Sequence, residues 1–167
     1  GLPHGYDHKY IYSHRGYNLK LSDMQAAVGV AQLGKLEGFI EARRRNYDRM
    51  RAGLEDVQDV FLLPEATEHA DPSWFGFLMV IEPSAPFTRG DLVAHLEGRR
   101  IQTRMLFAGN LTRHPCFDEL RATGTGYRVI GDLSTTDEIM ERAAWIGVYP
   151  GMSGAELMVE ARRLRPN

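Results

Sequence analysis

An almost unbroken apolar run at residues 74–81 (Trp-Phe-Gly-Phe-Leu-Met-Val-Ile) constrains the fold more than any other segment of the chain. Strands that are apolar along their whole length are typical of the centre of a sheet, where both faces are covered. Pro83 and Pro86 follow and end the run, because proline cannot donate to a sheet ladder. We therefore expect a central strand here, with the rest of the domain layered around it.

The flanking patterns predict further short strands and helices. Thr88 and Asp91 have the spacing of a capping box, which favours a helix start. The predicted strands cover 60–63, 101–106 and 146–149, and the predicted helices cover 88–98, 116–121, 137–144 and 153–166. This order is typical of an α+β fold, a small and mainly antiparallel sheet with helices on one face.

A long helical pattern precedes the sheet. Ser22 and Gln25 also have capping-box spacing, and apolar residues then recur at helical intervals. A second helical stretch follows over 41–54, while Gly34 and Gly38 weaken the middle. The pattern predicts either one long, bent helix or two abutting helices.

Composition excludes several classes of function. The 167 residues suit one domain with an appended helix, and the net charge of −2 gives no positive field for nucleic acid. Cys116 is the only cysteine, so neither an intrachain disulfide nor a cysteine-ligated cluster can form. No apolar run approaches the roughly 20 residues of a membrane span. We expect a cytoplasmic protein with no nucleic-acid or membrane partner.

Residues 1–21 are rich in tyrosine, histidine and glycine and predict a loop or hairpin that leads into the helix. His4, His8 and His14 do not share a helix face, so we expect no metal site. A polar, aromatic loop normally serves a functional site, yet little sequence precedes this one and Gly1 is not a natural start. We expect the chain to be one part of a larger enzyme.

The candidate binding residues each suit two roles. The Asn18 amide suits either donation to a phosphate or stabilisation of a turn. Arg113 suits either a bidentate phosphate contact or a surface ion pair. Phe75 and Phe77 suit either the core or a site, and Gly76 between them allows another group to come close. No paired carboxylates, nucleophile elbow or glycine-rich phosphate loop stands out.

Several segments together resemble the DegT/DnrJ/EryC1/StrS sugar aminotransferase family, and within it the 3-dehydrases of nucleotide-linked 4-keto-6-deoxyhexoses. They lie at 5–10, 12–14, 16–27 with its Gly-Tyr-Asn motif, 71–77, 103–104 with 106–115, 127–129 and 145–151. The segments around Trp74 and over 107–115 are specific to the 3-dehydrase branch. The resemblance covers nearly the whole chain.

The resemblance implies a fold-type I enzyme dimer, in which a large α/β domain holds pyridoxamine or pyridoxal phosphate and a small C-terminal domain closes over it. This chain would supply an arm at 1–21 that reaches a partner subunit, a connecting helix at 22–57 and the small α+β domain at 58–167. The cofactor-binding domain would lie outside it. The 3-dehydrase branch removes the sugar's 3-hydroxyl in deoxysugar biosynthesis for lipopolysaccharides or antibiotics. Some members use an iron–sulfur cluster and a reductase.

The resemblance also implies roles for individual residues. Asn18 would reach the cofactor phosphate of the partner subunit. The residues expected to line the substrate pocket are His14, Tyr17, Phe75, Phe107, Asn110 and Arg113. The catalytic His, the Asp at the pyridine nitrogen and any cluster cysteines would lie upstream, so no catalytic residue is expected here. Two alternatives stay open: the C-terminal domain of a sugar aminotransferase, and a non-catalytic interaction domain using the arginine-rich helix at 43–51.

Overall fold

The computed structural model describes residues 15–17 and 19–152. Its contacts divide the chain into two compact units, Gly1–Leu36 and Glu37–Asn167. The predicted helix at 153–166 lies outside the described residues. The predicted roles of the segments 1–21, 22–57 and 58–167 stay predictions.

Helix α1 (Asp23–Leu33) belongs to the first unit. The predicted capping box is present: the Ser22 hydroxyl accepts from the Gln25 backbone N–H, and the Ser22 N–H donates to Gln25 Oε1 at 2.9 Å. These contacts satisfy backbone donors that the first helical turn would otherwise leave unpaired. No residue of α1 is buried, although most of its side chains are apolar.

Helix α2 (Leu36–Gly53) is separate from α1. The Gly34 N–H donates to Val30 O at 3.3 Å and the Lys35 N–H to Gln32 O at 2.9 Å, which closes the last turn of α1. Of the two open alternatives, the structure has two helices, and the second begins earlier than the predicted stretch 41–54.

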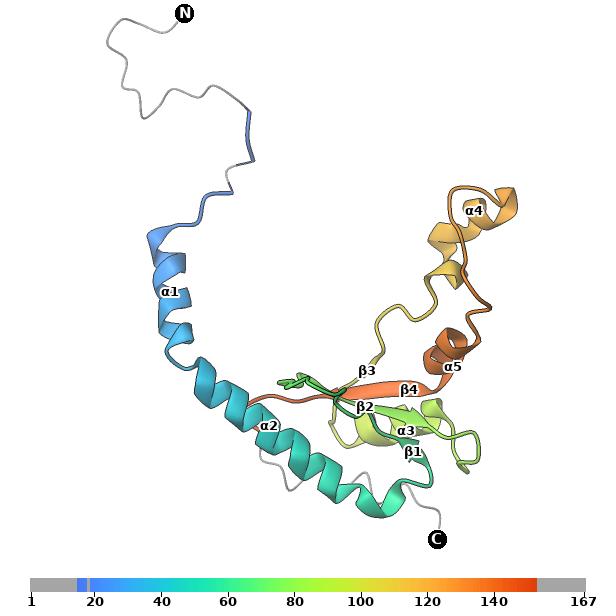
Figure 1. Cartoon of the computed structure of the whole chain (residues 1–167), viewed down its shortest axis with the longest axis horizontal. Helices are drawn as coiled ribbons and strands as arrows, with labels where there is room; N and C mark the ends of the chain where they lie inside the picture. The colour runs from blue at the N-terminus through green and yellow to red at the C-terminus, as the bar shows by residue number, and fades with distance from the viewer. Residues whose placement is uncertain (1–14, 18, 153–167) are drawn as a thin grey trace, which may run out of the picture. The chain divides into compact units, whose positions relative to one another are not determined.

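The second unit is built on a four-stranded antiparallel sheet with the order β1-β2-β4-β3 (Figure 1). The strands are β1 (Phe61–Leu62), β2 (Gly76–Ile81), β3 (Thr103–Met105) and β4 (Ala143–Gly147). Because β2 pairs with both β1 and β4, the predicted central strand and the small antiparallel sheet are confirmed.

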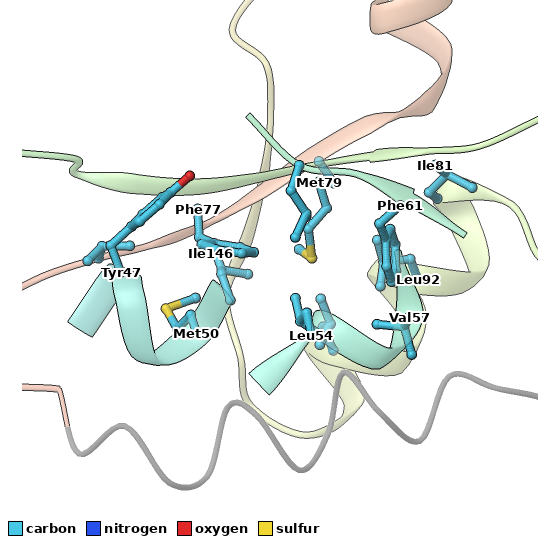
Figure 2. Packing of buried hydrophobic residues seen from close by; sticks show 14 residues of the cluster. Tyr47, Met50, Leu54, Val57, Phe61, Phe77, Met79, Ile81, Leu92 and Ile146 are labelled. Carbon is cyan, nitrogen blue, oxygen red and sulfur yellow. The ribbon is translucent and has the colours of Figure 1, made fainter. Parts of the chain in front are cut away.

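The hydrophobic core lies between one face of this sheet and two helices, α2 and α3 (Arg89–Gly98), as Figure 2 shows. Along β2 buried and half-buried residues alternate, so one side of the strand faces the core. The core side chains are Phe77, Met79 and Ile81 of β2, Tyr47, Met50, Leu54 and Val57 in and after α2, Phe61, Leu92, Leu96 and Ile146. Burying each such side chain contributes about 1.5–3 kcal/mol.

Element boundaries near β4 differ from the sequence predictions. Helix α5 (Ser134–Arg142) ends and β4 begins at Ala143, whereas 137–144 was predicted helical and 146–149 extended. Ala143 and Ala144 are almost fully buried, at 1% and 0% exposure, and pair with β2 in the sheet. Burial in the sheet therefore overrides the helix preference of alanine.

The remaining elements are short. They are η2 (Glu55–Val57), η3 (Leu111–Arg113), η4 (Pro115–Phe117) and α4 (Asp118–Thr123). The helix predicted over 116–121 is thus divided between a 3-10 turn and a slightly later α-helix. Residues 107–115, which belong to a segment of the family resemblance, contain η3 and the first residue of η4.

Candidate functional site

Three aromatic side chains from separate segments meet at the sheet. Trp145 of β4 lies edge-on to Phe75, with ring centroids 5.3 Å apart, and tilted against Phe107 at 6.3 Å. Phe75 and Phe107 are 56% and 72% exposed, and Trp145 is half-buried. We call these three side chains the aromatic wall. It is an apolar surface within the second unit that these ring contacts hold together.

Two contacts fix the position of the Trp145 ring. Its Nε1–H donates to the Met105 carbonyl at 2.8 Å. The ring also passes directly over Gly76, where an added Cβ would lie 2.5 Å from Trp145 Cε3. The expectation that Gly76 admits another group is confirmed, and that group is the indole of the neighbouring strand.

Arg104 of β3 is the direct cross-strand partner of Trp145, with Leu78 of β2 on the other side. Directly opposed residues of antiparallel strands point to the same face of a sheet. Arg104 is exposed and makes no ion pair with any described residue. A positive charge therefore stands beside the aromatic wall.

Phe107 has a backbone conformation that residues other than glycine rarely adopt. Its φ is +49°, and its N–H donates to the Met105 carbonyl at 2.7 Å in a tight turn directly after β3. The left-handed region costs a non-glycine residue about 1–2 kcal/mol. The ring gains little burial in return, since it is 72% exposed. Strain of this kind persists only where the surrounding structure enforces it.

The enforcing structure is the segment that follows, centred on Asn110. The Asn110 side chain is 4% exposed; its Nδ2 donates to Asp137 Oδ1 at 2.6 Å. Its Oδ1 accepts from the backbone N–H and the hydroxyl of Thr112, at 3.1 and 2.6 Å. Gly109, at φ +59°, lies against Met140 of α5 so closely that a Cβ would be 2.6 Å from its Cγ. The loop behind Phe107 is therefore anchored to α5.

Arg113 is also tied to α5. Its Nη2 pairs with Asp137 Oδ2, so Asp137 accepts from both Asn110 and Arg113. Arg113 remains about half exposed, at 54% of its side chain. One guanidinium nitrogen is engaged with Asp137, and the other N–H donors of the fork have no described side-chain partner.

A separate open hollow of about 580 Å³ lies beside β1, lined by Arg51, Phe61, Leu62, Pro64 and Glu65, among others. Its cation is already engaged: Arg51 Nη1 donates to the Pro64 carbonyl and Nη2 pairs with Glu65, both at 2.8 Å. None of its lining residues belongs to the aromatic wall. We therefore place the candidate site at the wall rather than at this hollow.

The perturbed carboxyl groups lie at turns and helix ends. Hydrogen bonds from the Thr88 hydroxyl and N–H lower the pKa of Asp91. The Thr103 N–H and hydroxyl lower the pKa of Glu97, and the Ser134 N–H and hydroxyl lower the pKa of Asp132. Each shift is explained by local hydrogen bonds to a neighbouring Thr or Ser, so the shifts do not indicate a catalytic acid or base.

Of the residues predicted for the site, the structure brings together Phe75 and Phe107 around Trp145, and Asn110 with Arg113 around Asp137. Tyr17 lies in the first unit and is 92% exposed. His14 and Asn18 lie outside the described residues. Within the part that is described, no three His, Cys, Asp or Glu side chains are placed to hold a metal ion. None of the described helices is long and apolar enough to cross a membrane.

Sequence reasoning missed Trp145, Arg104 and Asp137 as participants. Trp145 of β4 pairs with Arg104 of β3, and the short sequence of neither strand reveals this pairing. The glycine at Gly76 was the available signal for a bulky neighbour, although it did not identify which one. Asp137 follows Asn110 and Arg113 by 27 and 24 positions, and no local motif marks it, so it is found only through the fold.

Comparison with known proteins gives one family and several relatives. A model of the DegT/DnrJ/EryC1/StrS aminotransferase family matches residues 1–161. The lipopolysaccharide biosynthesis protein RfbH of Salmonella typhimurium is 49% identical over 156 residues, covering 93% of this chain and 35% of RfbH. The dTDP-4-dehydro-2,6-dideoxy-D-glucose 3-dehydratase of Saccharopolyspora spinosa is 52% identical over 152 residues, covering 91% of this chain and 32% of that enzyme.

The fold has a counterpart among solved structures. The GDP-4-keto-6-deoxy-D-mannose-3-dehydratase of E. coli with bound hydrated PLP (pyridoxal phosphate) aligns with a TM-score of 0.78 at 24% identity, covering 94% of this chain and 39% of that one. This likeness confirms the fold. The chain spans about a third of the length of the curated relatives it matches.

Proposed function

The chain belongs to the DegT/DnrJ/EryC1/StrS aminotransferase family, and from that premise we propose that it is the C-terminal part of a nucleotide-sugar 3-dehydratase. The proposed reaction is removal of the 3-hydroxyl from a nucleotide-linked 4-keto-6-deoxyhexose. The observation that carries the proposal is identity of about half the aligned residues with the Saccharopolyspora spinosa dehydratase, over nearly the whole chain.

The proposed cofactor is pyridoxamine or pyridoxal phosphate, which would supply the electron sink for the elimination. The described residues form an aromatic wall with an adjacent arginine. We propose that the cofactor pocket is formed by the part of the enzyme that corresponds to the remaining two thirds of the longer relatives. The enzyme is proposed to be a cytoplasmic homodimer. Asn18 is proposed to reach the cofactor phosphate of the partner subunit.

Within this chain, we propose that the second unit contributes one wall of the substrate pocket. Phe75 and Phe107 would contact the sugar, and Arg113 would donate to the diphosphate with the N–H groups that Asp137 does not engage. Asn110 would position the loop, because its amide already has partners on both atoms. His14 and Tyr17 are proposed to complete the pocket from the N-terminal arm. If the whole enzyme uses an iron–sulfur cluster and a reductase, as some members of the 3-dehydrase branch do, both would bind outside this pocket wall.

A chimera tests the proposal. The C-terminal third of the Saccharopolyspora spinosa dehydratase is replaced by this chain, and consumption of the dehydratase's own substrate is measured. We expect activity, because about half the aligned residues are identical. The matched control grafts the chain onto a sugar aminotransferase of the same family. A graft that restores transamination but not dehydration would instead favour the aminotransferase alternative.

A second measurement tests whether the cofactor pocket lies outside the chain. The 167-residue chain is titrated with pyridoxamine phosphate and followed by absorbance. We expect no stoichiometric complex. A tight complex with a shifted cofactor spectrum would show that the chain carries its own pocket, and would contradict the proposed division of the enzyme.

A further inference from the structure

The aromatic wall offers an apolar surface without a hydrogen-bonding group for a ligand. The only polar side-chain atom of its three residues is Trp145 Nε1, which already donates to the Met105 carbonyl at 2.8 Å. Phe75 and Phe107 present bare rings, at 56% and 72% exposure. A hydroxyl group pressed against this surface would lose its water and gain no partner, which is unfavourable. A methyl or C–H face would lose no hydrogen bond there.

The rigidity of the wall supports a binding role. Phe107 is held at a φ of +49° by a loop that the buried Asn110 ties to α5. The Trp145 indole is fixed over Gly76 and by its hydrogen bond. Exposed rings held in one geometry bind with a smaller loss of conformational entropy than free side chains do.

Charge next to the wall narrows the ligand class. Arg104 points to the same sheet face as Trp145 and has no ion-pair partner among the described residues. Arginine is well suited to a phosphate or diphosphate group. A ligand that is apolar at one end and anionic a few ångströms away fits this surface, and a nucleotide-linked deoxysugar has both features.

The proposed substrates share one apolar feature. The relatives are named for sugars carried on dTDP in one case and GDP in another, yet both sugars are 6-deoxy and so end in a methyl at carbon 6. Building on the proposed function, we infer that Phe75, Phe107 and Trp145 receive the carbon-6 methyl and adjoining C–H face of the hexose. The wall thereby selects 6-deoxy sugars over sugars that keep the 6-hydroxyl, with Arg104 placed for the diphosphate.

Two unreactive probes test this selectivity. The compounds dTDP-6-deoxyglucose and dTDP-glucose differ by a single hydroxyl, and neither has the 4-keto group that the proposed reaction needs. Each is added to the 167-residue chain, and saturation transfer from protein to ligand protons is measured by NMR. We expect the strongest transfer on the carbon-6 methyl and about fourfold or greater preference for the deoxy sugar, as one methylene-sized apolar group gives.

A matched pair of variants assigns the signal to the wall. Phe107→Asn removes the ring but keeps a residue that tolerates positive φ, so the loop should fold as before. We expect it to abolish the preference. Ile130→Ala removes an apolar side chain of similar exposure, 75%, that has no place in the wall, and should leave the preference unchanged. Equal loss in both variants would contradict the assignment.

The outcomes separate this inference from the proposed function. Equal binding of the two probes, saturation confined to the base protons, or no saturation at all would each overturn the inference, because the wall is exposed in this chain. An active chimera would then leave the proposed dehydratase standing. A clear preference with an inactive chimera would support the sugar surface while contradicting the proposed reaction.

Discussion

At Gly76 the backbone and the Trp145 ring are in direct contact, so the residue type is set by a neighbour on another strand. Because an added Cβ would lie 2.5 Å from Trp145 Cε3, Gly76→Ala must displace the indole or the strand. We expect the free energy of unfolding to fall by about 1–3 kcal/mol, as for overpacked cores. Denaturant unfolding measures this loss.

Gly147 supplies the matched control. It is the cross-strand partner of Gly76, but no heavy atom lies within 4 Å of the position its Cβ would take. Gly147→Ala should be neutral or stabilising, by up to about 1 kcal/mol, because glycine loses more backbone entropy on folding. Similar destabilisation by both substitutions would refute the role given to the indole.

Asp137 joins the two polar residues of the loop, so its contribution is measurable as a coupling. Asp137→Asn weakens the contact to Asn110 Nδ2 and removes the charge opposite Arg113. We expect each of Asp137→Asn and Asn110→Ala to cost about 1–3 kcal/mol, since each leaves a polar group without its partner. In urea unfolding, the double variant should cost less than the sum by about 0.5–3 kcal/mol. Strict additivity would show that the two side chains do not act together.

The sequence alone could not separate these roles. Asn110 and Arg113 stand in a loop of mixed aromatic, amide and guanidinium residues, which is typical of a ligand pocket. Their partner, Asp137, is brought in from α5 by the fold, 27 and 24 positions away. A binding role and a loop-anchoring role use the same side-chain donors, so only the contacts tell them apart.

Helix α3 starts at a capping box whose carboxylate responds to pH. Hydrogen bonds from Thr88 lower the pKa of Asp91 below the ordinary value of 3.8. A lowered folded-state pKa gives stability that is present above the unfolded pKa and is lost as the pH falls through the folded value. We therefore expect the free energy of unfolding to fall less steeply between about pH 5 and 2 in Asp91→Asn than in the unsubstituted chain, as measured by urea unfolding at each pH. An unchanged acid response in Asp91→Asn would mean that other groups control it.

Tyr47 connects α2 to the sheet and predicts the opposite response in alkali. It lies against Trp74 and Phe77, with ring centroids 5.4 and 5.1 Å away, and its hydroxyl donates to the Pro64 carbonyl at 3.2 Å. Burial raises the pKa of Tyr47 above the ordinary 10.0, against an opposing effect of Arg51. The resulting stability is complete below pH 10 and is lost as the pH rises through the higher folded-state value.

Replacing the phenol isolates that response. Tyr47→Phe should cost about 1 kcal/mol at neutral pH through the lost hydrogen bond. The midpoint temperature of thermal unfolding should then fall less steeply between about pH 9 and 12 than in the unsubstituted chain. An unchanged alkaline slope in Tyr47→Phe would mean that another group controls it.

Where local chemistry sets an element's limits, the sequence predicts them well. Both capping boxes, at Ser22 and Thr88, begin helices as expected. The predicted limits of the helix at 137–144 and the strand at 146–149 are wrong, because Ala143 and Ala144 follow a helical pattern but are buried and pair with β2. Alanine carries little β preference of its own, so only the sheet partner reveals the strand.

At the scale of the whole molecule, α1 has an exposed apolar surface. Its side chains are largely apolar, and Met24, Val28, Val30 and Leu33 are 81%, 62%, 70% and 68% exposed. A helix that is apolar around its circumference normally lies buried. Under the proposed function, protein corresponding to the rest of the longer relatives, of which this chain spans about a third, would cover α1.

The chain by itself should therefore associate through α1. Sedimentation velocity should show a mass that rises above the 18.9 kDa of one copy as the concentration increases, because exposed apolar surface promotes self-association. In the double variant Met24→Glu with Val28→Lys, charges four residues apart support the helix while removing apolar surface. That variant should stay at the single-copy mass. The control is Thr123→Lys on α4, which places a lysine four residues after the exposed Glu119 and so creates the same charge pair away from α1. This control should still associate. If the unsubstituted chain remains monomeric at every concentration, α1 is stable uncovered and its apolar surface does not require a covering partner.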